Sequence, residues 1–232
     1  MQEKLSSFIT DISDLFLSPR KLAERIDEKP RVAAPIIFLA ILSIVPALSV
    51  RDVTKEFVLN GLQMPPSFDG NVFVNIAIII GIILSPLGAI LNAAIESVKL
   101  FLFGKIFKGS AKFESLFSMT LYTTIITQCG AVINALLVNL SRNLYANFSL
   151  AYFLPKGTNR MIYTLVSLLN PFFIAVFIVD IIMIQVIHRY DKKSAVATVV
   201  LTFVFNILLV MLLTWANSSF STTGYSNPYS KF

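Results

Sequence analysis

The chain has 232 residues, of which 56% are hydrophobic and only 14% are charged, and its formal net charge is +6. Soluble domains are about half apolar and about a quarter charged, so this composition excludes an ordinary soluble globular domain and indicates that lipid forms part of the solvent. One cysteine and one histidine exclude an intrachain disulfide and leave too few ligands for a Cys/His metal site. We therefore expect no metal and no cofactor.

The N-terminal segment, residues 1–31, is predicted to be an amphipathic cytoplasmic region. Its apolar residues recur at steps of three and four, the period of one helix face, and they define a docking face of Leu5, Phe8, Ile12 and Leu15. The acidic reverse side favours docking on protein, either the protein's own inner rim or a partner, over lying on the inner leaflet, and both options remain open. Ser18-Pro19 predicts the start of a second helix, which ends at Lys29-Pro30.

Five apolar stretches follow, and each reaches or approaches the roughly 20 residues that a helix needs to cross about 30 Å of hydrocarbon. Because loops cannot satisfy their backbone polar groups in lipid, the sequence predicts an all-α integral membrane protein with five transmembrane helices. The predicted spans are 32–50, 72–95, 115–140, 161–187 and 194–216, which form one membrane domain over residues 32–216. The polar stretch 217–232 has no helical period and is predicted to be a disordered outer tail.

The positive charges are distributed unevenly between the two sides of this predicted bundle. Of the 19 Lys and Arg residues, 13 precede the first span or lie in the connections after the second and fourth spans, and six lie on the other side. Positive charge stays on the cytoplasmic side of a membrane, so the N-terminus is predicted inside and the C-terminus outside. No nucleic-acid-binding motif accompanies the basic charge, so we expect no nucleic-acid partner.

Three charged residues fall within or beside the predicted spans, namely Glu96, Lys99 and Asp180. Asp180 lies about 10 Å from the inner end of the fourth span by helical rise. An aspartate near the bilayer centre costs about 2.5–3.5 kcal/mol, so it should find a cation, and Lys99 is the nearest in depth. We therefore group the three as an intramembrane polar cluster. A structural pair of Lys99 with Asp180, separate solvated charges, and a transport or proton site all remain open.

Three stretches of the chain resemble the Yip (Ypt-interacting protein) domain family of five-span membrane proteins. They are "LFLSPRKLAERIDEKPRVAAPIIF", "LFGKIFKGSAKFESLFSMTLYTTII" and "HRYDKKSAVATVV", and the resemblance extends from about Leu15 to Ala216. It implies a non-enzymatic protein that binds partners, which are small GTPases for eukaryotic members and ABC exporter subunits for some bacterial ones. The motif D-L-x-G-P of eukaryotic members survives only as "DLFLSP" with altered spacing, which implies the bacterial branch.

Motifs of serine hydrolases, zinc proteases and P-loop enzymes are absent from the sequence, so we expect no catalytic site. We expect a membrane scaffold or accessory subunit that binds the lipid bilayer and other membrane proteins, including components of an ABC exporter, in the bacterial plasma membrane. Two alternatives stay open. One is a small secondary transporter or channel, and the other is a location in a eukaryotic Golgi or endoplasmic reticulum membrane.

Overall fold

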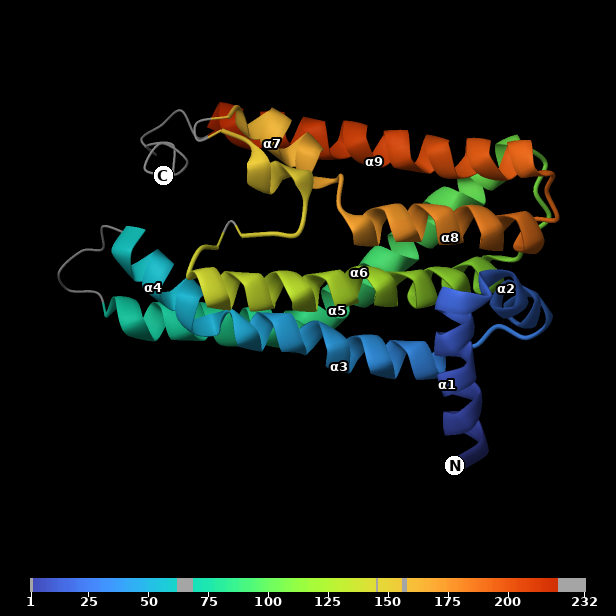
Figure 1. The fold of residues 1–232 in the computed structure, drawn as a ribbon, viewed down its shortest axis with the longest axis horizontal. Coiled ribbons are helices and arrows are strands. Elements are labelled where there is room, and N and C mark those ends of the chain that lie inside the picture. The colour runs from blue at the N-terminus through green and yellow to red at the C-terminus, as the bar shows by residue number, and fades with distance from the viewer. Residues whose placement is uncertain (1, 62–68, 145, 156–157, 221–232) are drawn as a thin grey trace.

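The computed structural model describes residues 2–61, 69–144, 146–155 and 158–220, and over these residues it contains helices without strands. The predicted all-α class is therefore confirmed. The elements are α1 (Gln2–Leu17), α2 (Pro19–Glu28), α3 (Ala33–Ser49), α4 (Arg51–Gly61), α5 (Gly70–Ile106), α6 (Phe113–Ser141), the 3-10 helix η1 (Leu150–Phe153), α7 (Arg160–Ser167), α8 (Pro171–Ile187) and α9 (Lys192–Phe220). The long helices run side by side, while α1 lies across one end of the bundle beside α2 (Figure 1). We call this end the α2 end and the opposite one the α4 end.

Three helices, α5, α6 and α9, are each long and apolar enough to cross a membrane. Two helix pairs meet the same requirement jointly but are bent, α3 with α4 by 45° and α7 with α8 by 58°. Within the described residues the protein thus has three candidate spans, or up to five if each bent pair counts as one. The predicted number of five corresponds to the upper count, and the chain is a multi-span membrane protein.

The bend between α7 and α8 has a local cause in the sequence. Asn170 precedes Pro171, and the residue before a proline avoids the helical conformation, so Asn170 is extended with φ −122° and ψ 152°. Its side chain then accepts a hydrogen bond of 2.8 Å from the backbone N–H of Phe173 and caps α8. The stretch predicted as one span, 161–187, is consequently built from two helices.

The helix α5 is the longest element, and it begins where Asp69 accepts hydrogen bonds from the backbone N–H groups of Asn71 and Val72. Its 37 residues correspond to roughly 55 Å, which is well beyond the thickness of the hydrocarbon. At the other end of the chain, α9 runs on to Phe220 and so includes the first residues of the predicted tail. Residues 221–232 lie outside the described part of the structure.

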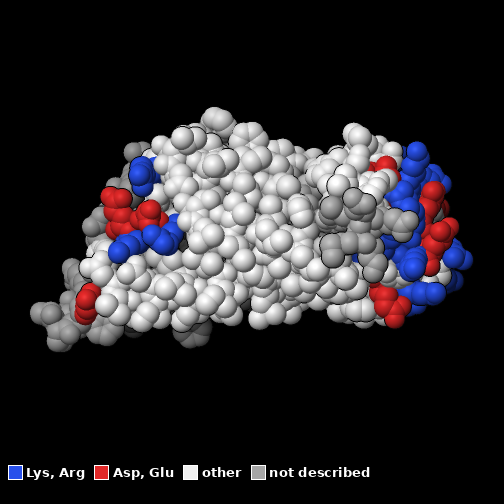
Figure 2. All heavy atoms as spheres, turned by 90° about the horizontal axis from the view of Figure 1, so that it is seen from below, with Lys and Arg blue, Asp and Glu red and all other residues white. Residues whose placement is uncertain are grey.

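The core of the bundle lies around α6, which packs against α3, α5 and α8. Six large side chains of α6 are almost fully buried, namely Leu116, Met119, Leu121, Tyr122, Ile125 and Ile126. In contrast, α5 and α9 expose long rows of apolar side chains. A broad uncharged band crosses the middle of the molecule on the face drawn in Figure 2, and the charged side chains gather at its two ends. This is the surface expected of a helix bundle surrounded by lipid.

Candidate functional site

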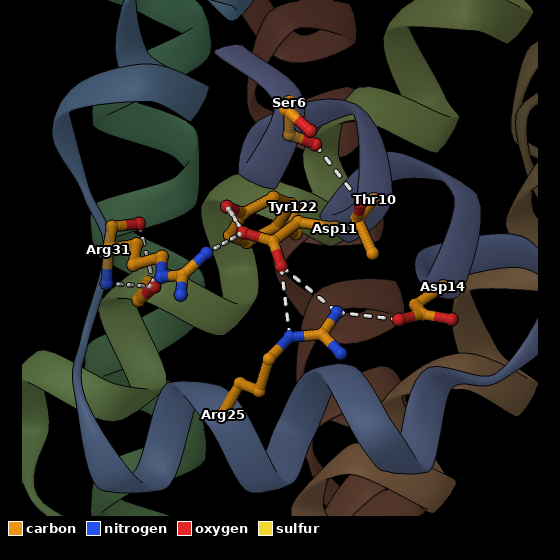
Figure 3. Close-up of polar contacts among 8 residues, drawn as sticks. Ser6, Thr10, Asp11, Asp14, Arg25, Arg31 and Tyr122 are labelled. Atoms are coloured by element: carbon orange, nitrogen blue, oxygen red, sulfur yellow. Dashed lines mark hydrogen bonds and ion pairs between the residues drawn. The ribbon is translucent and has the colours of Figure 1, made fainter. Parts of the chain in front are cut away.

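A single buried carboxylate joins the N-terminal arm, which we define as α1 and α2, to the membrane bundle (Figure 3). Asp11 of α1 is only 1% exposed. Its Oδ1 accepts a hydrogen bond of 3.1 Å from Arg25 Nε of α2 and forms an ion pair with Arg25 Nη2 at 3.0 Å. Its Oδ2 accepts from Arg31 Nη1 at 2.8 Å and from the Tyr122 hydroxyl of α6 at 3.0 Å. Four donors from three parts of the chain therefore satisfy one carboxylate.

The two arginines of this cluster make further hydrogen bonds besides those to Asp11. Arg25 also donates to Asp14 Oδ2 at 2.6 Å. Burial disfavours its charged form, but the hydrogen bonds to Asp14 and Asp11 outweigh this effect and raise the pKa of Arg25. The backbone of Arg31 exchanges two hydrogen bonds with the Ser118 hydroxyl of α6, at 3.1 Å and 2.8 Å. The elbow between α2 and α3 is thus fixed to the same helix as the arm.

The predicted docking face of α1 lies against the protein's own bundle. Leu15 is fully buried, and Phe8 and Ile12 are half-buried against the core. The Phe8 ring lies 5.5 Å from the ring of Phe38 and 6.2 Å from that of Tyr122. Leu5 belongs to α1, but its side chain lies outside the described residues. The structure therefore brings this face to the protein's own rim, and docking on a partner remains a proposal.

The arm also carries exposed apolar residues outside the predicted docking face, and two of them, Ile9 and Phe16, share the spacing of the apolar helix face in the sequence. Ile9, Phe16 and Leu17 are 61%, 53% and 79% exposed. We refer to these three residues as the arm patch. The sequence indicates such a patch, because α1 has more apolar residues than the one stripe that packs on the core requires, and the additional ones are Ile9, Phe16 and Leu17.

The intramembrane polar cluster is only partly assembled as predicted. Lys99 donates hydrogen bonds to Glu96 Oε1 at 2.5 Å and to Asn206 Oδ1, while Asn206 Nδ2 donates to the same Glu96 oxygen at 3.0 Å. Glu96 and Lys99 come from α5, whereas Asn206 lies near the middle of α9. The three groups form a closed triangle, in which the ammonium and the carboxylate neutralise each other within the bundle.

Asp180 of α8 stands apart from this triangle. Within the described part of the chain no ion pair joins it to Lys99, and its buried Oδ1 has no hydrogen-bond partner. It nevertheless faces the same cavity of about 130 Å³ as Glu96 and Asn206. The sequence thus indicated the three charged residues, but Lys99 contacts Glu96 and Asn206 rather than Asp180.

A second buried polar group lies at the α2 end, where His188 follows α8. Its ring is 2% exposed, stacks on Tyr190 with the ring centroids 4.8 Å apart, and accepts at Nδ1 from the backbone N–H of Ala111 at 3.4 Å. Burial lowers the pKa of His188 to about 4, the nearby charge of Lys105 adds to this, and the Leu100 backbone opposes it. His188 is therefore neutral at physiological pH, and it serves packing between α5 and the α8–α9 turn.

Comparison with known proteins gives one family match. The family model described as Yip1 domain matches residues 13–214, which include the C-terminal end of α1, all of α2 to α8 and most of α9. No curated protein matches the chain. No solved structure matches it either.

Proposed function

This chain belongs to the Yip1 domain family of membrane proteins, and on this premise we propose that it acts as a non-enzymatic scaffold or accessory subunit that binds other membrane proteins. The observation that carries the proposal is the arm. Asp11 holds α1 rigidly across the α2 end of the bundle, and this fixed helix presents the arm patch outward. A pre-ordered apolar surface binds a partner without the entropic cost of ordering a flexible segment.

The partner class follows from the surroundings of the patch. The arm lies at the end of the bundle that carries most of the Lys and Arg residues, which supports a cytoplasmic location for this end. A partner should therefore combine an apolar contact surface with acidic residues at the cytoplasmic side of a membrane. Subunits of an ABC exporter in a bacterial plasma membrane are the partners that the family resemblance suggests, and a Golgi or endoplasmic reticulum membrane is the alternative location.

Orientation can be tested independently of any partner. Single cysteines at Ser7 and Ser226, in a Cys129→Ala background, would be exposed to an impermeant thiol reagent in intact cells. The proposed orientation predicts labelling at position 226 only. Labelling at position 7 alone would place the arm outside and remove the argument for a cytoplasmic partner.

The scaffold role is tested by co-purification from native membranes. The double variant Phe16→Ser with Leu17→Ser removes apolar surface from the arm patch, and neither of the replaced residues is buried. A matched control is Leu150→Ser with Phe153→Ser in η1, where the two side chains are 55% and 80% exposed, close to the 53% and 79% of the arm pair. The proposal predicts that a specific membrane protein is lost with the arm variant and retained with the control. Equal recovery of that protein with both variants would refute the role of the arm.

A transporter is the second candidate, because a cavity between four helices of the bundle is lined by the Asp180 carboxylate, whose Oδ1 is buried. Purified protein reconstituted alone in liposomes would then move an ion or solute, and Asp180→Asn would change the flux. Reproducible flux together with failure of the arm experiment would favour the transporter. Absence of flux with loss of a partner from the arm variant would favour the scaffold.

A further inference from the structure

The cavity beside Asp180 is lined by four helices, α5, α6, α8 and α9, and its volume of about 130 Å³ is sufficient for a small ion with a few water molecules. It lies inside the helix bundle, where every polar group must find a partner within the protein or in the cavity. Its polar lining comes from Asn92, Glu96, Asp180 and Asn206 together with threonine side chains of α6 and α9, and its apolar lining includes Phe173, Phe177 and Phe203.

The charges around the cavity do not cancel. Glu96 and Lys99 neutralise each other through their contact of 2.5 Å, and Asn206 completes their hydrogen bonding. In its ionised form Asp180 adds one negative charge that no ion pair balances, and its buried Oδ1 has no hydrogen-bond partner among the described residues. A single positive charge in the cavity would balance it. One uncompensated negative charge matches a monovalent rather than a divalent cation.

The hydroxyl groups of the lining are arranged as acceptors. Thr124 donates its hydroxyl proton to Thr120 O at 2.6 Å, Thr127 to Thr124 O at 2.8 Å, and Thr202 to Thr198 O at 2.9 Å. A hydroxyl has one proton to donate, so each of these oxygens offers only lone pairs to the cavity. The Thr123 hydroxyl interacts with the Asp180 carboxylate itself. The oxygen acceptors and the Asp180 carboxylate in this lining suit a cation and disfavour an anion.

We propose that this cavity is a binding site for an alkali-metal cation of the size of Na⁺, with Asp180 as its anionic ligand and the hydroxyls of Thr124, Thr127 and Thr202 as neutral oxygen ligands. Hard cations prefer carboxylate, hydroxyl and water oxygens, as found here. In the described residues no three His, Cys, Asp or Glu side chains come together to hold a metal ion, which separates this site from a transition-metal centre. Binding would stabilise the packing of α6, α8 and α9 around the otherwise unbalanced charge, and it is independent of the scaffold role of the arm.

The test uses the full chain in nanodiscs of phosphatidylcholine at fixed pH. Thermal unfolding is followed in NaCl, in KCl and in choline chloride at equal ionic strength. We expect NaCl to raise the midpoint by at least about 3 °C over choline chloride in a saturable manner. The rise should disappear in Asp180→Asn and persist in the rim control Asp191→Asn, because Asp191 lies outside the cavity.

Direct binding of radioactive Na⁺ gives a second readout that does not depend on the stability of the aspartate variant. The pair Thr124→Val with Thr127→Val keeps the side-chain shape and removes two acceptor oxygens, so Na⁺ should bind at least about tenfold more weakly. Unchanged affinity in that variant would overturn the proposal. Equal midpoints in all three salts would also overturn it, because Asp180 would then be neutralised by a proton.

Discussion

The carboxylate of Asp11 in α1 accepts a hydrogen bond of 3.0 Å from the Tyr122 hydroxyl in α6, although the two residues are 111 positions apart. Tyr122 is a fully buried residue of the core, and Asp11 is almost as deeply buried in the arm. This contact makes the arm a fixed part of the membrane domain, and the position of the arm patch depends on it.

Weakening this contact should release the arm before the bundle unfolds. Tyr122→Phe removes one donor and should lower the free energy of unfolding by about 1.5–3 kcal/mol, because a hydrogen bond to a charged group is lost. Asp11→Asn should cost more, since Arg31 loses its ionic partner and Arg25 keeps only its ion pair with Asp14. Limited proteolysis after Arg20 and Lys21 in detergent would report release of the arm. The exposed pair of Arg51 with Asp52 supplies the control, because Asp52→Asn should change neither measurement. Identical cleavage rates in the wild type and the three variants would show that the contacts of Asp11 do not hold the arm on the bundle.

The triangle of Glu96, Lys99 and Asn206 predicts a specific pattern of coupling. Lys99→Met leaves the Glu96 carboxylate without its cation, and Lys99→Met with Glu96→Gln removes both charges, so the double variant should recover part of the lost stability. We expect a coupling energy of about 1–3 kcal/mol from unfolding midpoints. Lys99→Met should couple much more weakly to Asp180→Asn, since no contact joins these two residues. Stronger coupling of Lys99 to Asp180 than to Glu96 would show that Lys99 pairs with Asp180 instead.

The buried neutral His188 makes stability depend on pH. Its pKa falls from the usual 6.5 to about 4 on folding, chiefly through burial, so the unfolded chain binds more protons between these pH values. The free energy of unfolding contributed by His188 is complete above about pH 6.5 and is lost as the pH falls towards 4. The loss should be on the order of 3 kcal/mol, from about 1.36 kcal/mol per unit of pKa. Thermal unfolding of the protein and of His188→Gln across this range isolates the contribution, and parallel pH curves for the two would argue against it.

The close packing around His188 explains why positions 104 and 109 are glycines. Two other glycines of α5, which have free space around them, serve as controls. A Cβ added at Gly104 would lie 2.3 Å from His188 Cε1, and one at Gly109 would lie 2.1 Å from Nδ1. Gly104→Ala and Gly109→Ala should therefore lower the unfolding free energy by about 1–3 kcal/mol. Gly81→Ala and Gly88→Ala meet nothing within 4 Å and should be neutral or stabilising by up to about 1 kcal/mol, because alanine favours the helix. An equal loss of unfolding free energy in Gly81→Ala and Gly104→Ala would show that contact with His188 is not the cause of the destabilisation.

Much of the fold could be predicted because its signals are local. Apolar runs mark the membrane segments, Ser18-Pro19 marks the start of α2, and the 3.6-residue period marks the face of α1 that packs on the bundle. Asn170-Pro171 even carried the signal for the bend between α7 and α8. Each of these features is decided within one or two helical turns of the chain.

The contacts of the candidate sites are not local, and this is why the sequence left them open. Helices with apolar residues on all sides, such as α5 and α9, do not reveal which side faces the bundle, so nothing in the sequence turned Asn206 towards Lys99. Depth alone paired Lys99 with Asp180, whereas the rotation of α5 and α9 brings Lys99 to Asn206. The bond of Asp11 to Tyr122 likewise depends on how α1 crosses α6.

Site-specific photo-crosslinking in native membranes tests the proposed scaffold role most directly. A benzoyl-phenylalanine replaces Leu17 in the arm patch, and in a control chain it replaces Phe153, whose exposure of 80% matches the 79% of Leu17. The account predicts a covalent adduct between position 17 and another membrane protein, which is lost when Asp11→Asn releases the arm and is absent from position 153. Adducts with lipid alone at position 17, or the same protein adduct from both positions, would contradict it.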